Sequence, residues 1–226
     1  MKYKKIEEAV FISRPNRFVA NILIHGNVEF CHVKNTGRCK ELLIPGVPIY
    51  VEVHEDPKRK TKYSVIAVRK GDLLINMDSQ APNKVVKEWL LEKEPFGKLT
   101  LLKPETTFGD SRFDFYLETE NRKIFMEVKG VTLEEDGVAC FPDAPTERGV
   151  KHINELVEAK KEGYDAYLMF VIQMKNIRYL IPNDVTHKAF GEALRQASKA
   201  GVQILAYDCL VKPDGLWIED KVIIKL

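Results

Sequence analysis

Residues 125–132 read FMEVKGVT, an apolar run that holds an acid and a lysine two positions apart. We expect a β-strand over residues 123–131, in which successive side chains point to opposite faces of the sheet. Glu127 and Lys129 then share one face, while Met126 and Val128 occupy the other. Such a strand is either a surface strand with solvated charges or the floor of an active site. The flanking segments decide between these two interpretations.

The preceding run, SRFDFYLE at residues 111–118, also has two different faces. Its side chains alternate between an apolar and a polar face, with Phe113, Phe115 and Leu117 on the first and Arg112, Asp114 and Tyr116 on the second. A hairpin through residues 119–122 would place Asp114 across from Glu127 or diagonal to it. Two carboxylates and the ammonium group of Lys129 would then converge.

A cluster of this kind suits a hard cation. Mg²⁺ or Mn²⁺ binds through one or two carboxylates, here Asp114 and Glu127, and leaves positions for phosphate oxygens. The metal can stabilise the charge that develops on the phosphate, and Lys129 can orient the attacking water or help to deprotonate it. Hydrolysis of a phosphodiester is the natural reaction for these groups.

The same residues also fit an exposed hairpin without chemistry. Acids and lysines on the outer face of a hairpin are usually solvated, or form a cross-strand ion pair worth about a few tenths of a kcal/mol. The acid-x-lysine pattern is weak by itself, because Glu158-Ala159-Lys160 matches it on what reads as the exposed face of a helix.

The segment after the strand strengthens the catalytic interpretation. The residues DAPTER at 143–148 combine the capping residues, early proline and first-turn acid of a helix start, so we expect a helix from about residue 146 to residue 162. If one face of this helix looks toward the ends of the central strands, Arg148, Lys151 and His152 can hold phosphates. The alternative is a capped helix with a charged surface.

Residues 6–77 consist of short alternating runs broken by turn residues, which is typical of strands. Phe18, Ala20, Ile22 and Ile24 fall on one face of such a run. About five strands in some 75 residues predict a small closed barrel of the OB type, with a small sandwich as the alternative.

Beyond residue 80 the pattern changes to a helical one, with an apolar stripe formed by Val85, Val86, Trp89, Leu90 and Leu91. We therefore divide the chain into units 1–80 and 81–226. In the second unit we expect one further helix, at residues 185–200. We also expect strands at residues 99–102, 112–118, 123–131, 138–141, 167–172, 177–181 and 202–207. Antiparallel strands that lead into β-α-β elements predict a mixed sheet covered by helices, so the whole chain is of the α/β (α+β) class.

Amino-acid composition restricts the possible functions less than the motifs do. The 226 residues are 45% hydrophobic, which is ample for a packed core, and 35 basic against 33 acidic residues favour no charged partner. Residues 1–80 are the more basic part, with 14 basic and 9 acidic side chains.

The chain shows no signal peptide, no apolar run long enough for a membrane span and no C-x-x-C pair among its four cysteines. We expect a cytoplasmic, reduced protein without a membrane partner. Zinc between Cys31, His32 and Cys39 is disfavoured, because a structural zinc site needs four ligands at tighter paired spacing.

Two features of the first unit are candidates for nucleic-acid binding. Basic residues surround a turn that could receive a phosphate, the candidate residues being Lys34, Asn35, Thr36, Arg38 and Lys40. Four aromatic residues could stack on bases: Phe18, Phe30, Tyr50 and Tyr63. Because aromatic side chains in small barrels mostly fill the interior, we expect these four to be core residues.

Several motifs together resemble the sugar fermentation stimulation protein A family over nearly the whole chain. They are KNTGRCKELLIPG, SRFDFYLE, MEVKGVTL and GVACFPDAPTERGVKHINEL, of which the FPDA-x-TERG-x-KH block is the most specific. Relatives tend to carry a proline where this chain has Lys34.

The resemblance implies an N-terminal OB-like domain and a C-terminal domain similar to the PD-(D/E)xK nucleases. In that nuclease pattern, acids that match Asp114 and Glu127 hold the metal, and a lysine that matches Lys129 assists the water. Glu105 looks like the further upstream acid of such sites. The resemblance also implies DNA binding and a role in regulating sugar utilisation, and it leaves a homodimer open.

Three functions follow from these observations. The first is a DNA-binding protein with a Mg²⁺- or Mn²⁺-dependent phosphodiesterase domain. The second is a non-catalytic DNA-binding regulator of sugar-utilisation genes on a nuclease-like scaffold, against which the intact acidic cluster counts, because it would repel DNA without a metal. The third, an enzyme acting on a phosphorylated sugar, lacks any nucleotide- or phosphate-binding signature.

Overall fold

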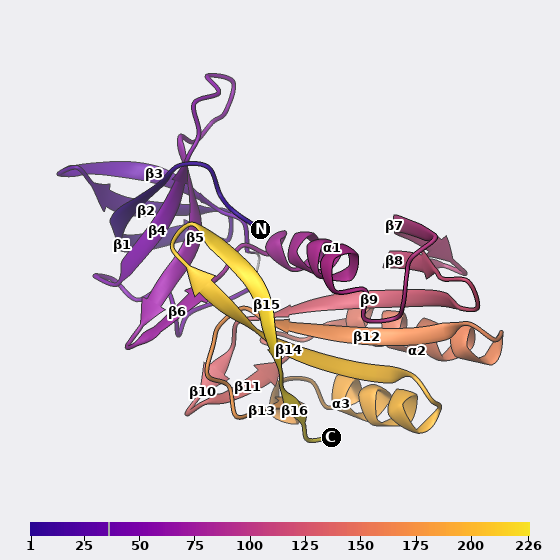
Figure 1. Cartoon of the computed structure of the whole chain (residues 1–226). Helices are drawn as coiled ribbons and strands as arrows, with labels where there is room; N and C mark the ends of the chain where they lie inside the picture. Colours follow the sequence, from indigo (N-terminus) through magenta and orange to yellow (C-terminus); the bar gives the residue numbers. More distant parts are fainter. Residues whose placement is uncertain (36) are drawn as a thin grey trace.

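Six strands build the N-terminal barrel in the computed structural model, which describes residues 1–35 and 37–226. They are β1 (Ile6–Asn16), β2 (Val19–Ile24), β3 (Asn27–Val33), β4 (Pro48–Val53), β5 (Tyr63–Lys70) and β6 (Leu73–Asn76). The strand order is β3-β2-β1-β4-β5-β6, and β3 also pairs with β5, which closes the barrel (Figure 1). The predicted OB-type barrel is therefore confirmed, rather than the alternative sandwich.

Alternation of apolar side chains fills the barrel interior. Ala20, Ile22 and Ile24 are buried on β2, as their period of two predicted. Phe18 does not share their environment and is 46% exposed. Its backbone amide donates to the Asn16 side chain at 2.9 Å, so Phe18 belongs to the tight turn before β2, where strand alternation no longer holds.

The expectation that all four aromatic residues lie in the core is only partly right. Tyr63 is buried and Tyr50 is partly buried. Phe30 is 65% exposed, because it alternates with the buried Cys31 on β3 and therefore points outward. Phe18 and Phe30 are thus corrected from core to surface.

A second, six-stranded sheet forms the body of the C-terminal unit. Its order is β15-β14-β12-β9-β8-β7, with bounds β7 (Leu101–Phe108), β8 (Ser111–Glu118), β9 (Lys123–Val131), β12 (Asp165–Ile172), β14 (Gln203–Lys212) and β15 (Gly215–Lys221). The β8–β9 hairpin runs through residues 119–122 as expected, and β9 and β12 are parallel. A mixed sheet is therefore confirmed.

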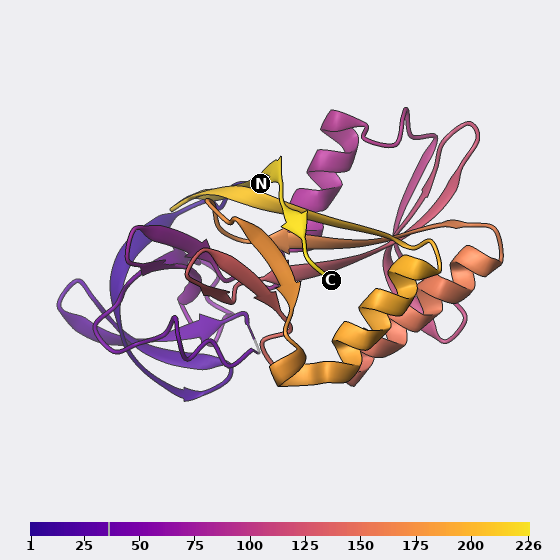
Figure 2. The ribbon, with the colours of Figure 1, turned by 90° about the horizontal axis from the view of Figure 1, so that it is seen from below.

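Helices cover both faces of this sheet (Figure 2). Helix α1 (Ala81–Lys93) packs its buried Val85, Val86 and Leu90 against one face. Helices α2 (Glu147–Lys161) and α3 (Asp184–Lys199) pack on the opposite face, against a cluster that includes Phe125 and Phe170. Leu91, expected in the buried stripe of α1, is exposed.

A small four-stranded sheet joins the two larger ones. Its order is β10-β11-β13-β16, with bounds β10 (Glu134–Glu135), β11 (Val138–Phe141), β13 (Tyr179–Pro182) and β16 (Ile223–Ile224). Buried side chains of the barrel and of the C-terminal unit belong to one continuous apolar cluster. None of the helices in the described part of the chain has the length and apolar composition that a membrane crossing requires.

Candidate functional site

The E-x-K segment of β9 faces helix α2. Glu127 is 3% exposed, and its Oε1 atom accepts a hydrogen bond from Lys129 Nζ at 2.6 Å. The same oxygen is hydrogen-bonded to Nδ1 of His152, which α2 holds in a buried position. Glu127, Lys129 and His152 therefore converge from two adjoining elements.

Asp114 joins this group because β8 separates from β9 at that residue. Regular pairing of the two strands ends at Phe115 opposite Met126. Beyond it, Asp114 Oδ2 accepts a hydrogen bond from the Val128 backbone amide at 2.7 Å, and Oδ1 accepts one from Asn83 on α1 at 2.6 Å. The Asp114 carboxylate thus occupies the place that a backbone carbonyl takes in a regular ladder.

This separation corrects the expected pattern of β8. Phe115 and Leu117 pack on the α1 side of the sheet, but Phe113 packs on the α2 side, with ring centroids 5.4 Å from Phe125 and 6.3 Å from His152. The three residues do not share one face, because the backbone departs from regular strand alternation at Asp114.

The two carboxyl groups have opposite protonation tendencies. Burial raises the pKa of Asp114 to about 6, and the negative charge of Glu127 adds to this effect. Burial alone would also raise the pKa of Glu127, but hydrogen bonds from His152 and Lys129 outweigh it and lower the pKa. Glu127 is therefore ionised at neutral pH, whereas Asp114 loses its proton as the pH rises through about 6.

Helix α2 brings two of its three candidate phosphate-binding residues close to Glu127. Arg148 Nε donates to His152 Nε2 at 3.3 Å, and a single neutral tautomer of His152 accepts this bond and donates its Nδ1 proton to Glu127. Lys151 points elsewhere, donating to the Asp110 carbonyl at 3.0 Å in the turn between β7 and β8. His152 is thus a buried support for Glu127, while Lys151 borders the site.

Glu105 lies on the other side of Asp114. It sits on β7 with a positive φ of 51°, and its side chain is exposed beside Arg112, with an N–O distance of 3.6 Å. Glu105 and Asp114 line one cavity of about 330 Å³ together with Lys84 and Lys87 of α1.

Sequence reasoning missed the contribution of α1. Asn83 orients Asp114 directly, and the lysines at positions 84 and 87 border the cavity. The available signal was the spacing of three between these lysines, which places them on one exposed face of the predicted helix. That spacing alone does not say that the face lies beside the Asp114 carboxylate.

The donor set fits a hard divalent cation. Glu127 Oε2 is buried and has no hydrogen-bond partner among the described residues. A buried carboxylate oxygen without a donor carries a large desolvation cost unless a cation or water satisfies it. Together with the Asp114 carboxylate, it offers the oxygen ligands that Mg²⁺ and Mn²⁺ prefer.

The basic turn of the barrel is organised from within. The Arg14 guanidinium donates to the carbonyl groups of Asn35, Gly37 and Arg38 at 2.6, 3.0 and 2.9 Å. The Gly37 amide donates to the Asn35 side chain, so it is already paired within the loop. Arg38 and the neighbouring Lys40 expose their side chains to solvent.

The remaining candidates at this turn are Thr36 and Lys34. Thr36 lies outside the described residues. Lys34 points away from the turn, with Nζ 3.1 Å from Asp78 and 3.5 Å from Glu52. The loop lies against the second unit instead. Gly37 is so close to Asp143 that an added Cβ atom would lie 2.3 Å from its Oδ2 atom.

A small polar cavity of about 110 Å³ lies where this loop meets the end of β9. Asn35 and Ser79 line it from the first unit, and Gly130, Thr132 and Asp143 line it from the second. The barrel loop and the strand that carries Glu127 and Lys129 are therefore neighbours in space.

Comparison with protein families gives two matches. The family model described as the sugar fermentation stimulation protein RE domain matches residues 80–215. The model described as the SfsA N-terminal OB domain matches residues 12–77.

Individual relatives agree with these matches. A sugar fermentation stimulation protein homolog of Desulfitobacterium hafniense (strain DSM 10664 / DCB-2) is 61% identical, covering 100% of this chain and 99% of the relative. The homolog of Clostridium beijerinckii is 58% identical, covering 98% of each chain. Among solved structures, Pyrococcus furiosus SfsA, described in complex with Ca²⁺, is 27% identical with a TM-score of 0.89, covering 100% of this chain and 98% of that one.

Proposed function

The chain belongs to the sugar fermentation stimulation protein family, and from this premise we propose that it binds DNA and cleaves phosphodiester bonds with Mg²⁺ or Mn²⁺. The observation that carries the proposal is the convergence of Asp114, Glu127 and Lys129 where β8 separates from β9. Two acids with opposed pKa shifts beside a lysine are typical of a hydrolytic centre rather than of a surface ion pair.

Asp114 and Glu127 would hold the metal. The Pyrococcus furiosus relative is described in complex with Ca²⁺, another hard cation that prefers oxygen ligands, and this supports the choice of metal class. When bound, the metal supplies electrostatic stabilisation of the charge that develops on the phosphate. Glu105, which is exposed on the same cavity as Asp114, would act at longer range.

The remaining residues position the reacting groups. Lys129, whose ammonium group is 2.6 Å from Glu127, orients the attacking water at the ionised carboxylate. His152 holds Glu127 through a hydrogen bond, and Arg148 in turn holds His152. Because Lys129 and His152 both donate to Oε1, Glu127 keeps a fixed orientation and directs Oε2 away from them.

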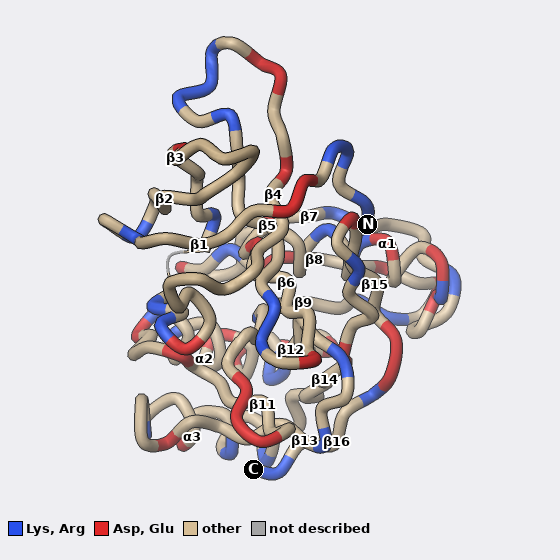
Figure 3. The backbone as a smooth tube through the Cα atoms, turned by 90° about the vertical axis from the view of Figure 1, so that its left-hand side faces the viewer, with Lys and Arg blue, Asp and Glu red and all other residues tan. Residues whose placement is uncertain are grey.

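DNA binding by the barrel is supported by its outer surface. Phe30 and Phe18 expose aromatic rings, on which bases can stack. The loop between β4 and β5, at residues 54–62, projects beyond the barrel and carries basic side chains along one arm (Figure 3). In OB folds the face of the second and third strands, with the adjoining loops, is the usual surface for oligonucleotides.

Incubation with labelled single- and double-stranded DNA in Mg²⁺ or Mn²⁺ tests the proposal. Lys129→Ala and Glu127→Gln should each lower the cleavage rate about 100-fold or more, because the first removes the group that orients the water and the second removes a metal ligand. A matched control is the other acid-x-lysine pattern, as Glu158→Gln with Lys160→Ala, which should cleave like the wild type. Cleavage that persists in both site variants would refute the assignment, and binding without any cleavage would favour the regulator.

A further inference from the structure

Helix α1 carries a basic face that connects two surface cavities. Lys84 and Lys87 line both of them. One cavity, of about 490 Å³, reaches Lys4 and Lys34 beside the barrel. The other, of about 330 Å³, reaches the Asp114 carboxylate. A continuous path therefore leads from the barrel along α1 to the Asp114 carboxylate.

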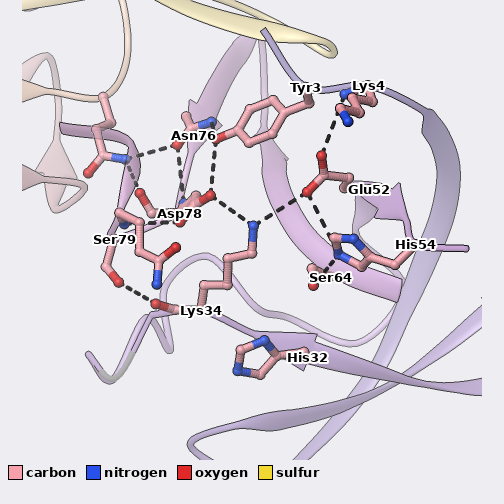
Figure 4. Close-up of polar contacts among 12 residues, drawn as sticks. Tyr3, Lys4, His32, Lys34, Glu52, His54, Ser64, Asn76, Asp78 and Ser79 are labelled. Atoms are coloured by element: carbon pink, nitrogen blue, oxygen red, sulfur yellow. Dashed lines mark hydrogen bonds and ion pairs between the residues drawn. The ribbon is translucent and has the colours of Figure 1, made fainter. Parts of the chain in front are cut away.

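The acids that line the larger cavity are engaged with groups other than the ammonium groups of Lys4, Lys84 and Lys87. Of the two glutamates that line the larger cavity, Glu52 lies 3.5 Å from Lys34, and Glu88 lies 2.6 Å from the amino group of Met1. Figure 4 shows the Lys34 ammonium group directed toward Asp78 and Glu52, so Lys34 is held within a polar network of the barrel.

The other lysines of the path, unlike Lys34, form no ion pair among the described residues. Among the described residues, no carboxylate lies within 4.0 Å of the ammonium groups of Lys4, Lys84 or Lys87. Like-charged ammonium groups along one groove create a positive potential that attracts a polyanion. This potential ends at Asp114, where the proposed metal would add further positive charge.

Apolar surface accompanies the lysines along the path. Leu91, one turn beyond Lys87 on α1, is 55% exposed and lines the larger cavity. Pro104 on β7 is exposed in the smaller one. Exposed apolar side chains next to free ammonium groups suit a ligand that offers base faces and phosphates side by side. A single strand offers both, whereas a duplex stacks its bases inside and presents mainly phosphates.

We propose that the α1 lysine face, formed by Lys84, Lys87 and Leu91, is the channel that guides single-stranded DNA from the barrel to Asp114. This inference rests on the proposed function and names the strand form of its substrate. The phosphates contact Lys84 and Lys87, and the bases lie against Leu91 and Pro104.

Binding measured without cleavage tests the channel separately from catalysis. In EDTA, the affinity for a labelled single-stranded oligonucleotide is followed over a series of salt concentrations for the wild type, Lys84→Gln/Lys87→Gln and the control Lys93→Gln/Lys98→Gln. Glutamine keeps nearly the helix propensity of lysine, so α1 stays folded in both double variants. The control residues are exposed at the other end of α1 and just beyond it.

The channel predicts a specific change in salt dependence. The slope of log affinity against log salt should fall by about 1.4 in Lys84→Gln/Lys87→Gln, since each lost phosphate contact of a single strand contributes about 0.7. The control should keep the wild-type slope. Equal slopes in the two double variants, or tighter binding of the duplex than of the single strand, would overturn the channel and leave the proposed cleavage untouched.

Chemical footprinting locates the strand directly. Lysine acetylation read by mass spectrometry should be reduced at Lys84 and Lys87 when the single-stranded oligonucleotide is present, and unchanged at Lys93. Protection at Lys93 but not at Lys84 and Lys87 would refute the path. Failure of the wild type to bind any DNA, both in EDTA and with Mg²⁺ present, would instead refute the proposed function on which the channel rests.

Discussion

At the scale of single residues, the site depends on two carboxyl groups with different surroundings. Glu127 receives hydrogen bonds from a lysine and a histidine, which keep it ionised despite burial. Asp114 receives its hydrogen bonds from a backbone amide and an asparagine, both neutral donors, and burial dominates. Glu127 is therefore held in its ionised form, while Asp114 takes up a proton as the pH falls through about 6.

The raised pKa of Asp114 predicts a pH dependence of stability. The folded protein keeps this proton up to about pH 6, whereas the unfolded chain loses it near the ordinary value of 3.8. The stabilisation is fully present below pH 3.8 and is lost as the pH rises through about 6. The unfolding free energy of the wild type, minus that of Asp114→Asn, should therefore decline from pH 4 to pH 7 in urea titrations.

An exposed carboxyl provides the control for this measurement. Asp72→Asn, on the surface turn between β5 and β6, should show a much smaller change over the same range. Metal affinity should rise as stability falls, because the cation competes with the proton of Asp114. A difference between wild type and Asp114→Asn that stays constant with pH would contradict the assignment.

His152 is a positioning residue in this scheme. Replacement by leucine removes the hydrogen bond that opposes the burial of Glu127, so the pKa of Glu127 should rise and Mn²⁺ should bind more weakly. Loss of such outer supports typically costs about 10- to 100-fold in metal affinity. Calorimetric titration at several pH values should show the weaker binding and a midpoint shifted to higher pH.

The conservative variant separates positioning from packing. His152→Gln keeps a hydrogen-bond donor and should recover part of the Mn²⁺ affinity. If His152→Leu and His152→Gln bound Mn²⁺ equally at every pH, His152 would have only a packing role.

At the scale of elements, α2 is the support of the site. Its N-cap Thr146 accepts a hydrogen bond from the Gly149 amide at 3.0 Å. The cap lies two residues before Arg148 and six before His152, so it stabilises the first two turns of the helix, which carry both residues. The opposing element, α1, orients Asp114 through Asn83.

Removal of the cap should destabilise the fold measurably. Thr146→Ala should lower the free energy of unfolding by about 1 kcal/mol, because the Gly149 amide loses its side-chain acceptor. Thr146→Ser keeps the oxygen and should lose less. Urea denaturation measures both variants, and equal stability of Thr146→Ala and the wild type would show that the cap is dispensable.

At the scale of the whole molecule, a buried polar network connects the barrel with the six-stranded sheet of the second unit. Gln173, at the end of β12, donates from Nε2 to the Asn76 side chain at 2.9 Å and to the Asp78 carbonyl at 3.1 Å. Its backbone amide donates to Val131 at the end of β9. Asn76 in turn donates to the hydroxyl of Tyr3. The two units are thus joined by specific bonds as well as by apolar packing.

Replacement of Gln173 tests this connection. Gln173→Met keeps a similar volume but removes both hydrogen bonds from Nε2, to the Asn76 oxygen and to the Asp78 carbonyl. At about 0.5–1.5 kcal/mol for each bond, the loss should cost about 1–3 kcal/mol. The exposed Gln203→Met should change stability by less than about 0.5 kcal/mol. Thermal and urea unfolding of the two variants measure the difference, and equal effects would show that the network adds nothing beyond packing.

Much of the architecture was predictable from local patterns. Alternation predicted the barrel strands and the β8–β9 hairpin, and the cap and proline predicted the start of α2 within a residue or two. These features depend on neighbours within a few positions, so sequence spacing carries them. The proximity of Asp114 to Glu127 also followed, because a hairpin pairs residues close in sequence.

Other features were decided only by the tertiary structure. Phe113 lies on the other face of the sheet because the Asp114 carboxylate replaces a backbone acceptor. Phe18 lies outside the core because it belongs to the turn before β2. The approach of Asn83, Lys84 and Lys87 to Asp114 depends on how α1 packs across the sheet, some thirty residues away in sequence. The sequence alone determined which residues carry the charges in FMEVKGVT, and packing of distant elements decided which neighbours those charges meet, because burial and hydrogen-bond partners depend on contacts that local spacing does not specify.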